Sequence, residues 1–237
     1  MEFYYKIADL NVKMDTFGRT LTQAEPYRCP PVEQPDISLA DCWKLIQPLA
    51  PQYNQDDCEY MGTGGCFYLE LLRHSGMMLH SSAVILDGRA YLFTAPSGTG
   101  KSTHTQLWLQ QFGSRAQILN DDKPALRKMD GTWYAYGTPW SGKTNLNIPT
   151  RAPLAGICML ERGPENRIAP AGCKEALLYL MSQTQRPRQK ELAENFLVLL
   201  DDLITTVPLW KLQCNMDPQA AQVSCNAMSG VRKDGKQ

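Results

Sequence analysis

The sequence predicts an α/β fold built on a mixed, largely antiparallel sheet, with a small section in front of it. Three observations lead to this prediction. Two pairs of apolar, β-prone runs are each joined by an Asp-Gly turn, which is a strong hairpin signal. One of the four runs leads into a glycine-rich loop that is followed by a helical pattern. An amphipathic helix and a further strand follow in the last third of the chain.

The length of 237 residues suits one large domain with an appendage, and we divide the chain into residues 1–75 and 76–237. The formal net charge is zero, with no long basic run, which argues against a nucleic-acid partner. No apolar stretch reaches the length of a membrane span, and the N-terminus lacks a signal-peptide core. We therefore expect no membrane association and a cytoplasmic location.

The eight cysteines contain no C-x-x-C pair, and only three histidines accompany them. Structural zinc sites usually need two close pairs of ligands, so the spacing favours reduced thiols over a metal site. Cys158 lies within the apolar run 155–160, where a buried thiol is the simpler interpretation.

The N-terminal section, residues 1–75, carries weak structural signals. Residues 3–8 and 10–14 alternate loosely and predict edge strands, and the proline-rich stretch 27–36 predicts irregular structure. Gly62-Thr-Gly-Gly65 predicts a loop, followed by a helix over 67–73. We find no motif in this section and expect at most contact with a substrate or partner.

The two hairpins come next. Residues 82–86 and 89–93 flank Asp87-Gly88, and residues 125–129 and 132–136 flank Asp130-Gly131 in the same way; all of these are short β-prone runs. The first hairpin makes the strand that enters the glycine-rich loop antiparallel to its predecessor. Doubly wound nucleotide-binding folds instead enter that strand from a parallel crossover, so the common parallel folds are disfavoured.

The glycine-rich loop matches the P-loop pattern, with Ala95 in place of its first glycine, between a strand ending at Thr94 and a helix that Gly113 ends. Its glycines let backbone N–H groups face phosphate oxygens at a helix N-terminus. Lys101 would reach the β- and γ-phosphates, and the Ser102 hydroxyl would hold Mg²⁺. The alternative is an ordinary strand-to-helix connection. The predicted phosphate-binding residues are Ala95, Pro96, Ser97, Gly98, Thr99, Gly100, Lys101, Ser102 and Thr103.

Paired carboxylates follow a short apolar strand over 116–119. Phosphoryl transfer to a hydroxyl needs a group that orients or deprotonates the acceptor and a carboxylate that positions Mg²⁺. We assign Asp121 to the acceptor and Asp122 to the metal, although the pair is better supported than this division of roles. Asn-Asp-Asp alone also forms an ordinary polar turn.

Three further residues are weaker candidates. Lys143, in the loop after the second hairpin, would neutralise developing phosphate charge, with Trp140 as a wall of the pocket; the alternative is a solvated lysine beside a packed tryptophan. His80 precedes the first hairpin, where a structural role is the more common one. Arg162 would contact a phosphate or lie in an exposed turn.

The ordered set His80-Ser-Ser, the Asp-Gly hairpin, Pro96–Ser102 and Asn120–Asp122 resembles the catalytic domain of HPr kinase/phosphorylase. That fold is shared distantly with the ATP-dependent phosphoenolpyruvate carboxykinases, and the resemblance covers roughly residues 75–165. The sequence is similar above all to the small bacterial HPr-kinase-related proteins. The resemblance implies that residues 95–102 bind ATP, that Ser102 and Asp122 serve Mg²⁺, that Asp121 is the general base, and that His80 lies near the γ-phosphate. It also implies a homo-oligomer.

One departure limits what the resemblance implies. The bifunctional enzymes carry a Glu-Ile-Arg-Gly-Leu-Gly signature where this chain has residues 139–143, so the reverse, phosphorylase reaction is not implied. The sequence thus predicts an ATP- and Mg²⁺-dependent kinase that acts on a hydroxyl, foremost a serine of a peptide or protein. The alternatives are a nucleotide-binding regulatory module without turnover, and a small-molecule kinase or carboxykinase-like enzyme.

Overall fold

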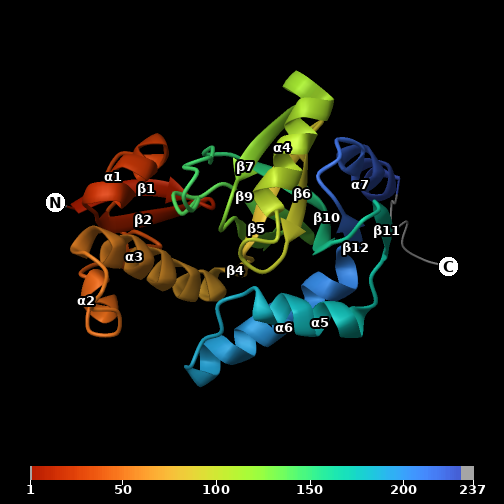
Figure 1. Ribbon diagram of the computed structural model, residues 1–237. Helices are drawn as coiled ribbons and strands as arrows, with labels where there is room; N and C mark the ends of the chain where they lie inside the picture. The colour runs from red at the N-terminus through yellow and green to blue at the C-terminus, as the bar shows by residue number, and fades with distance from the viewer. Residues whose placement is uncertain (1, 231–237) are drawn as a thin grey trace.

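A computed structural model describes residues 2–230 of the chain (Figure 1). The N-terminal section contains a small sheet with the strand order β1-β2-β3, in which β2 is antiparallel to β1 and parallel to β3. Its helices pack against this sheet. The elements are β1 (Glu2–Ile7), β2 (Leu10–Asp15), α1 (Gly18–Ala24), η1 (Glu25–Tyr27), β3 (Ile37–Leu39), α2 (Trp43–Ile46), α3 (Gln55–Leu71) and η2 (Leu72–His74).

The predicted loop over Gly62–Gly65 is wrong, because these glycines lie inside the long helix α3. The helix begins with the Asn54 side chain accepting a hydrogen bond from the Asp57 N–H. A Cβ on Gly62 would lie 2.4 Å from the Cys42 carbonyl oxygen, and one on Gly64 would lie 2.8 Å from Trp140 Cδ1. Two of the glycines therefore permit close packing and do not mark a turn.

The larger sheet is mixed and has the strand order β4-β8-β9-β10-β6-β5-β7, with β12 and β11 attached beyond β10. The long strand β10 joins its two parts. Its first residues pair antiparallel with β9, and the rest lies parallel to both β6 and β12. The strands are β4 (Gly76–Met78), β5 (Ser81–Leu86), β6 (Arg89–Thr94), β7 (Ala116–Asn120), β8 (Ala125–Met129), β9 (Thr132–Tyr136), β10 (Arg151–Arg162), β11 (Arg167–Pro170) and β12 (Leu209–Cys214).

Both predicted hairpins are present, as β5–β6 and β8–β9. In each, the turn residues Asp and Gly both have a positive φ, for example 48° at Asp87 and 77° at Gly88. This conformation matches the right-handed twist of the flanking strands, which is why Asp-Gly is favoured there. The remaining pairings of the sheet are also antiparallel, apart from the two parallel pairings of β10.

Helices cover both faces of the larger sheet (Figure 1). Trp108 of α4 and Met228 of α7 are buried in one apolar core, and Leu180 of α5 and Leu200 of α6 are buried in the core on the opposite face. The predicted amphipathic helix before Pro208 is confirmed as α6. The helices are α4 (Lys101–Phe112), η3 (Gly113–Arg115), α5 (Cys173–Ser182), α6 (Lys190–Thr206) and α7 (Gln219–Ser229).

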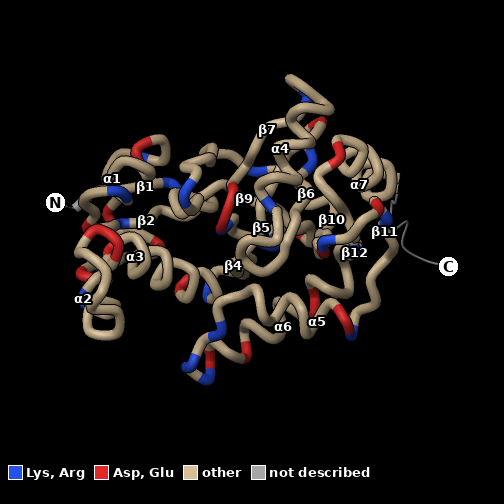
Figure 2. Tube along the Cα trace, in the orientation of Figure 1, with Lys and Arg blue, Asp and Glu red and all other residues tan. Residues whose placement is uncertain are grey.

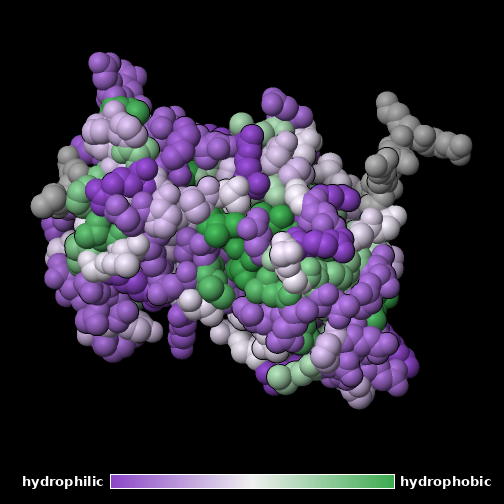
Figure 3. Space-filling view, turned by 90° about the horizontal axis from the view of Figure 1, so that it is seen from above, coloured by the Kyte–Doolittle hydropathy of each residue, from purple (hydrophilic) through white to green (hydrophobic). Residues whose placement is uncertain are grey.

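A third core joins the N-terminal section to the larger sheet. It contains Tyr5 and Val12 of the small sheet, Phe67 of α3, and Tyr136 and Trp140 from β9 and the loop behind it. The loop over residues 137–150, which we call the β9–β10 loop, thus contacts the N-terminal section through Trp140, and also through hydrogen bonds at Gly142 and Asn147. Seen from above, a hollow near the middle of the molecule has apolar residues on its floor and hydrophilic residues around it (Figure 3).

The remaining sequence-wide features concern charge, thiols and membranes. Basic and acidic positions are interspersed along the described chain, with no segment of a single sign standing out (Figure 2). Cys158 is fully buried in β10, as its apolar surroundings predict. Within residues 2–230, no helix is both long and apolar enough to span a bilayer. In the same residues, no cluster of three or more His, Cys, Asp or Glu side chains is placed to hold a metal.

Candidate active site

A cavity of about 440 Å³ gathers most of the residues that the sequence singled out. It lies where the loop after β6, the end of β7 and the start of β5 meet the β9–β10 loop. Strand register explains this convergence, because Ser81 pairs with Thr94 of β6 and Ala83 pairs with Asn120 of β7. The cavity is lined by His80, Ser97, Gly98, Gly100, Lys101, Ser102, Thr103, Asp121, Asp122, Ser141, Gly142, Lys143 and Thr144.

The glycine loop, residues 95–100, connects β6 to α4 as the sequence predicts. Gly98 and Gly100 have φ values of 77° and 122°, which L side chains rarely adopt. A Cβ at either position would meet no atom within 4 Å, so backbone conformation and not space requires glycine there. Gly100 is the N-cap of α4 and provides no side-chain cap, which leaves the first N–H groups of the helix without a side-chain acceptor. Such a helix start favours an anion.

Lys101 lies in the first turn of α4 and is buried, with 7% of its surface exposed. Its Nζ donates to the Ala95 carbonyl oxygen at 2.9 Å. Burial lowers its pKa, while the nearby carboxylates of Asp122 and Asp121 oppose this shift. The lysine is therefore held against the glycine loop, with both carboxylates close enough to act on its charge.

Arg162, at the end of β10, braces the same loop from outside. Its Nε donates to the Thr99 carbonyl oxygen at 3.1 Å, and its guanidinium also contacts the carbonyl oxygen of Gly98. With the carbonyls directed at Arg162, the loop is fixed by a residue of the neighbouring strand. The sequence suggested a direct phosphate contact or an exposed turn for Arg162; in the structure it is exposed at the end of β10 and contacts the glycine loop.

Asp121 is buried at the end of β7, with 6% of its surface exposed. Its Oδ1 accepts a hydrogen bond of 2.5 Å from the Ser82 hydroxyl, which lies 2.8 Å from Thr105 Oγ1 on α4. Its backbone N–H donates to the Leu146 carbonyl oxygen of the β9–β10 loop at 3.1 Å. The carboxylate is thus oriented by β5 and α4 together, a geometry suited to receiving a proton from an acceptor hydroxyl.

Asp122 points to a more polar part of the cavity. Its Oδ1 lies 3.2 Å from His80 Nε2, and its Oδ2 accepts from Lys123 Nζ at 2.7 Å. Burial raises the pKa of Asp122, but the hydrogen bond from His80 and the charge of Lys123 outweigh it and lower the pKa to about 2. The group is therefore an anion at neutral pH. His80 is held on its other side by Gln183, whose Oε1 lies 3.1 Å from Nδ1.

The β9–β10 loop is clamped by the N-terminal section. The Gly142 N–H donates to Tyr60 Oη of α3 at 3.0 Å, and Arg19 of α1 contacts the Gly142 carbonyl oxygen while its guanidinium lies 4.1 Å from the centre of the Tyr60 ring. Gly142 itself has a φ of 70°. Lys143, the next residue, is exposed and lines the cavity. Residues of α1 and α3 thus set the position of the loop that presents Lys143.

Trp140 does not wall this cavity. It is buried, stacks on Phe67 of α3 with ring centroids 4.9 Å apart, and donates to Thr63 Oγ1 at 3.3 Å. For Trp140, the packed alternative is therefore the correct one. The physical reason is the glycine at position 64, which lets the indole approach the helix backbone.

The structure brings most of the predicted site residues together and leaves three aside. Ala95, Pro96 and Thr99 do not line the cavity; Ala95 is fully buried and acts through its carbonyl oxygen on Lys101. Sequence reasoning gave no role to Ser82, Lys123 or Ser141. Ser82 is the last residue of the motif His80-Ser-Ser, and Lys123 directly follows Asn120–Asp122, so polar residues in and beside these motifs were the available signal.

A second cavity, of about 450 Å³, lies on the other side of the glycine loop. It shares Gly98, Gly100 and Thr103 with the first cavity. Leu107 of α4, Leu160 of β10 and the exposed Met216 give it apolar walls. The start of α4 therefore separates a polar, charged cavity from one with apolar walls.

Comparisons with known proteins give little beyond this geometry. No family model and no curated protein matches the chain. Among solved structures, the Hpr(Ser) kinase/phosphatase from Coxiella burnetii matches with a TM-score of 0.37 and 10% sequence identity, over 65% of this chain and 97% of that one. We therefore base the function of this chain on its own cavities.

Proposed function

We propose that the chain is an ATP-dependent kinase that transfers the γ-phosphoryl group to a hydroxyl. One observation carries the proposal: a single cavity holds the start of α4 with Lys101 and Ser102, the two carboxylates of Asp121 and Asp122, and the exposed cation of Lys143. These are the groups that phosphoryl transfer requires, namely phosphate binding, metal positioning, an acceptor base and charge neutralisation.

The triphosphate would lie along the glycine loop, where Lys101 exchanges its bond to the Ala95 carbonyl for phosphate oxygens. The second cavity, with its apolar walls, is suited to the nucleoside part because it begins at the same glycines. Arg162 would keep the loop in place between the two. The nucleotide would then span the start of α4.

Mg²⁺ fits the donor set, because the Ser102 hydroxyl and the anionic Asp122 carboxylate are oxygen ligands that line one cavity. When bound, it supplies neutralisation of phosphate charge. His80 and Lys123 hold Asp122 in position from the protein side. In the transfer step the acceptor oxygen bonds to the γ-phosphorus, the bond to the β–γ bridging oxygen breaks, and the acceptor proton passes to Asp121.

The acceptor is proposed to be a serine of a peptide or protein. The two competing functions are a nucleotide-binding module without turnover and a kinase or carboxykinase-like enzyme for small molecules. Transfer from γ-labelled ATP, tested in parallel on serine peptides, free serine, other small hydroxyl compounds and oxaloacetate, separates the acceptors. Binding of ATP without transfer to any of them would favour the module.

The proposal is tested with Asp121→Asn, which keeps the size of the side chain and can still accept from Ser82 but cannot take up the acceptor proton. We expect ATP affinity within about twofold of the unchanged chain and a loss of transfer of about a hundredfold or more, the usual contribution of a general base. Asp130→Asn, in the exposed turn of the second hairpin, is the matched control and should be fully active. Equal transfer by the two variants would refute the assignment.

A further inference from the structure

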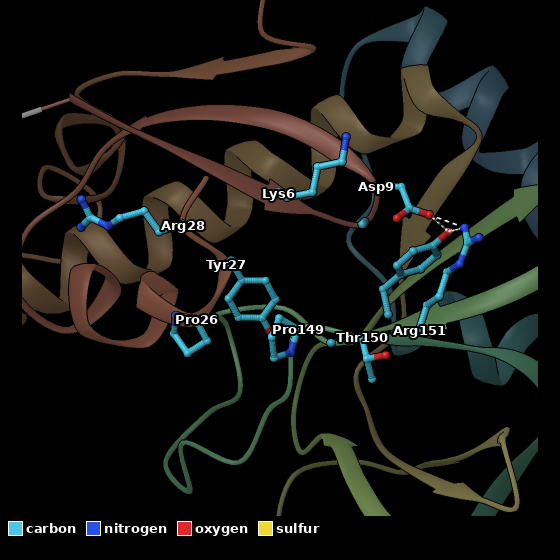
Figure 4. Close-up of a pocket in the computed structure, with 11 residues that line it drawn as sticks. Lys6, Asp9, Pro26, Tyr27, Arg28, Pro149, Thr150 and Arg151 are labelled. Carbon is cyan, nitrogen blue, oxygen red and sulfur yellow. Dashed lines mark hydrogen bonds and ion pairs between the residues drawn. The ribbon is translucent and has the colours of Figure 1, made fainter. Parts of the chain in front are cut away.

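A third cavity, of about 370 Å³, lies between the N-terminal section and the larger sheet, away from the residues of the candidate active site. We call it the seam cavity. Its walls come from the β1–β2 turn and η1 on one side, and from β9 and both ends of the β9–β10 loop on the other. Figure 4 shows Lys6, Asp9 and Arg151 along one edge, with Tyr27 beside Pro149 along another. Arg28 extends away from the other labelled side chains.

The two edges differ in chemistry. On the polar edge, Arg151 contacts Asp9 and lies 3.0 Å from Tyr136 Oη. Lys6 donates only to the neutral Asn11 side chain at 3.3 Å, and within residues 2–230 it has no carboxylate partner. The polar edge therefore carries two cations and one carboxylate. The opposite edge is formed by the largely buried ring of Tyr27 and the exposed ring of Pro149.

The turn that forms one wall is strained. Ala8 and Asp9 join β1 to β2 with φ values of 52° and 61°, a conformation that Asn-Gly adopts readily and alanine does not. The rest of the molecule holds it there, since Arg127 donates to the Ala8 carbonyl oxygen at 2.6 Å and Tyr136 donates to Asp9 at 2.8 Å. Strain of this kind is concentrated at functional sites in proteins.

The cavity is also connected to the candidate active site. Burial raises the pKa of Tyr27, so its hydroxyl stays protonated and donates to Asn147 Oδ1 at 2.8 Å. Asn147 Nδ2 in turn donates to Ser141 Oγ at 2.8 Å. Ser141 lines the candidate active site, the cavity that also contains the glycine loop. Two hydrogen bonds, the second of them within the β9–β10 loop, thus connect the wall of the seam cavity to Ser141 of the candidate active site.

We propose that the seam cavity binds a small ligand that carries a carboxylate or phosphate and a flat apolar part. Binding of this ligand changes the environment of Ser141 through Tyr27 and Asn147. The anionic group lies against Lys6 and Arg151, and the flat part lies against Tyr27 and Pro149. The volume lies within the range of small-molecule sites. This binding does not depend on the proposed kinase activity, since none of its residues touches the glycine loop.

The test uses phthalate and phenyl phosphate as probes, titrated into the full chain and followed by amide NMR shifts. We expect saturable binding that ATP does not displace, with shifts around Lys6 and Arg151. Lys6→Met should weaken it by about tenfold, as expected for losing one charge-assisted hydrogen bond, without changing the melting temperature. Lys190→Met, on the exposed surface of α6, is the matched control and should bind as the unchanged chain does.

A second variant tests the connection. Tyr27→Phe keeps the ring but removes the donor to Asn147, so the probes should still bind while the shifts at Ser141 and Gly142 disappear. Absence of saturable binding, displacement by ATP, or equal affinity in Lys6→Met would overturn the site. Tighter binding of hexaglutamate than of either probe would assign the cavity to an acidic peptide and overturn the small ligand. Persistent Ser141 shifts in Tyr27→Phe would overturn the connection.

Discussion

The Ser82 hydroxyl donates a hydrogen bond of 2.5 Å to Oδ1 of Asp121, and this bond ties the proposed base to the first hairpin. Ser82 is fully buried and also contacts Thr105 of α4, so it fixes the carboxylate relative to the start of the helix that follows the glycine loop. The orientation of Asp121 is thus determined by residues on both sides of the loop.

Ser82→Ala should therefore lower the rate of phosphoryl transfer by about tenfold, the equivalent of about 1.4 kcal/mol of transition-state stabilisation, by letting Asp121 rotate. ATP affinity should not change, because Ser82 does not line the cavity. Steady-state kinetics and a direct binding measurement check this. The control is Ser81→Ala, which also removes a fully buried hydroxyl but one that donates only to the Leu79 carbonyl oxygen. Equal losses of rate in both variants would contradict a positioning role for Ser82.

Arg162→Ala should weaken nucleotide binding without affecting the chemical step. The guanidinium braces the Gly98 and Thr99 carbonyls, and its loss would let the glycine loop sample conformations that do not match a triphosphate. Because the arginine is exposed, we expect an effect of about three- to tenfold on the Kd for ATP. Arg167→Ala, which removes an exposed arginine paired with Glu165 on the neighbouring segment, is the control. Unchanged affinity in Arg162→Ala would show that the loop is rigid without it.

The glycines of α3 predict opposite effects of the same substitution. Gly65→Ala should stabilise the fold by about 0.5–1 kcal/mol through helix propensity, because the new Cβ meets only Gln185 Nε2 at 3.7 Å. Gly62→Ala should instead destabilise it by about 1–3 kcal/mol, since its Cβ would lie 2.4 Å from the Cys42 carbonyl oxygen, a backbone atom that cannot move aside. Urea unfolding measures both. Stabilisation by Gly62→Ala would mean that α2 does not pack closely on α3.

This helix also shows where sequence reasoning reaches its limit. The hairpins and the glycine loop could be predicted because their signals are local. The dipeptide Asp87-Gly88 itself favours the turn conformation, and the glycine-loop pattern directly follows its strand and precedes its helix. Positions 62 and 64 of α3 are also glycine, but for a non-local reason, which is close contact with Cys42 and Trp140. Nothing within a short window distinguishes a glycine that turns from one that packs.

The candidate site divides in the same way. Lys101, Asp121 and Asp122 could be named from motif spacing, and the strand register places them around one cavity. The clamp of Tyr60 and Arg19 on Gly142 could not, because it joins positions that are far apart in the sequence and follows no pattern. The burial of Trp140 depends on the same long-range contacts.

Glu59 of α3 makes stability depend on pH. Its side chain is fully buried, Oε1 lacks a hydrogen-bond partner within the described residues, and the other oxygen is contacted by the Thr20 hydroxyl. Burial raises the pKa of Glu59 to about 7, with further contributions from the charges of Asp56 and Asp15, against the lowering effect of the Thr20 hydrogen bond. The folded chain therefore holds this proton at a pH where the unfolded chain has released it.

The sign of the effect follows from proton linkage. Because the folded-state pKa exceeds the unfolded one, the stabilising contribution is fully present below about pH 4.5 and is lost as the pH rises to about 7, by up to about 3 kcal/mol in total. Glu59→Gln, which cannot ionise, should flatten the decline in the free energy of unfolding between these pH values. Glu70→Gln, a half-exposed carboxylate on the same helix paired with Arg73, should leave the decline unchanged. Chemical denaturation at a series of pH values measures this, and an equal decline in Glu59→Gln would mean that another group titrates.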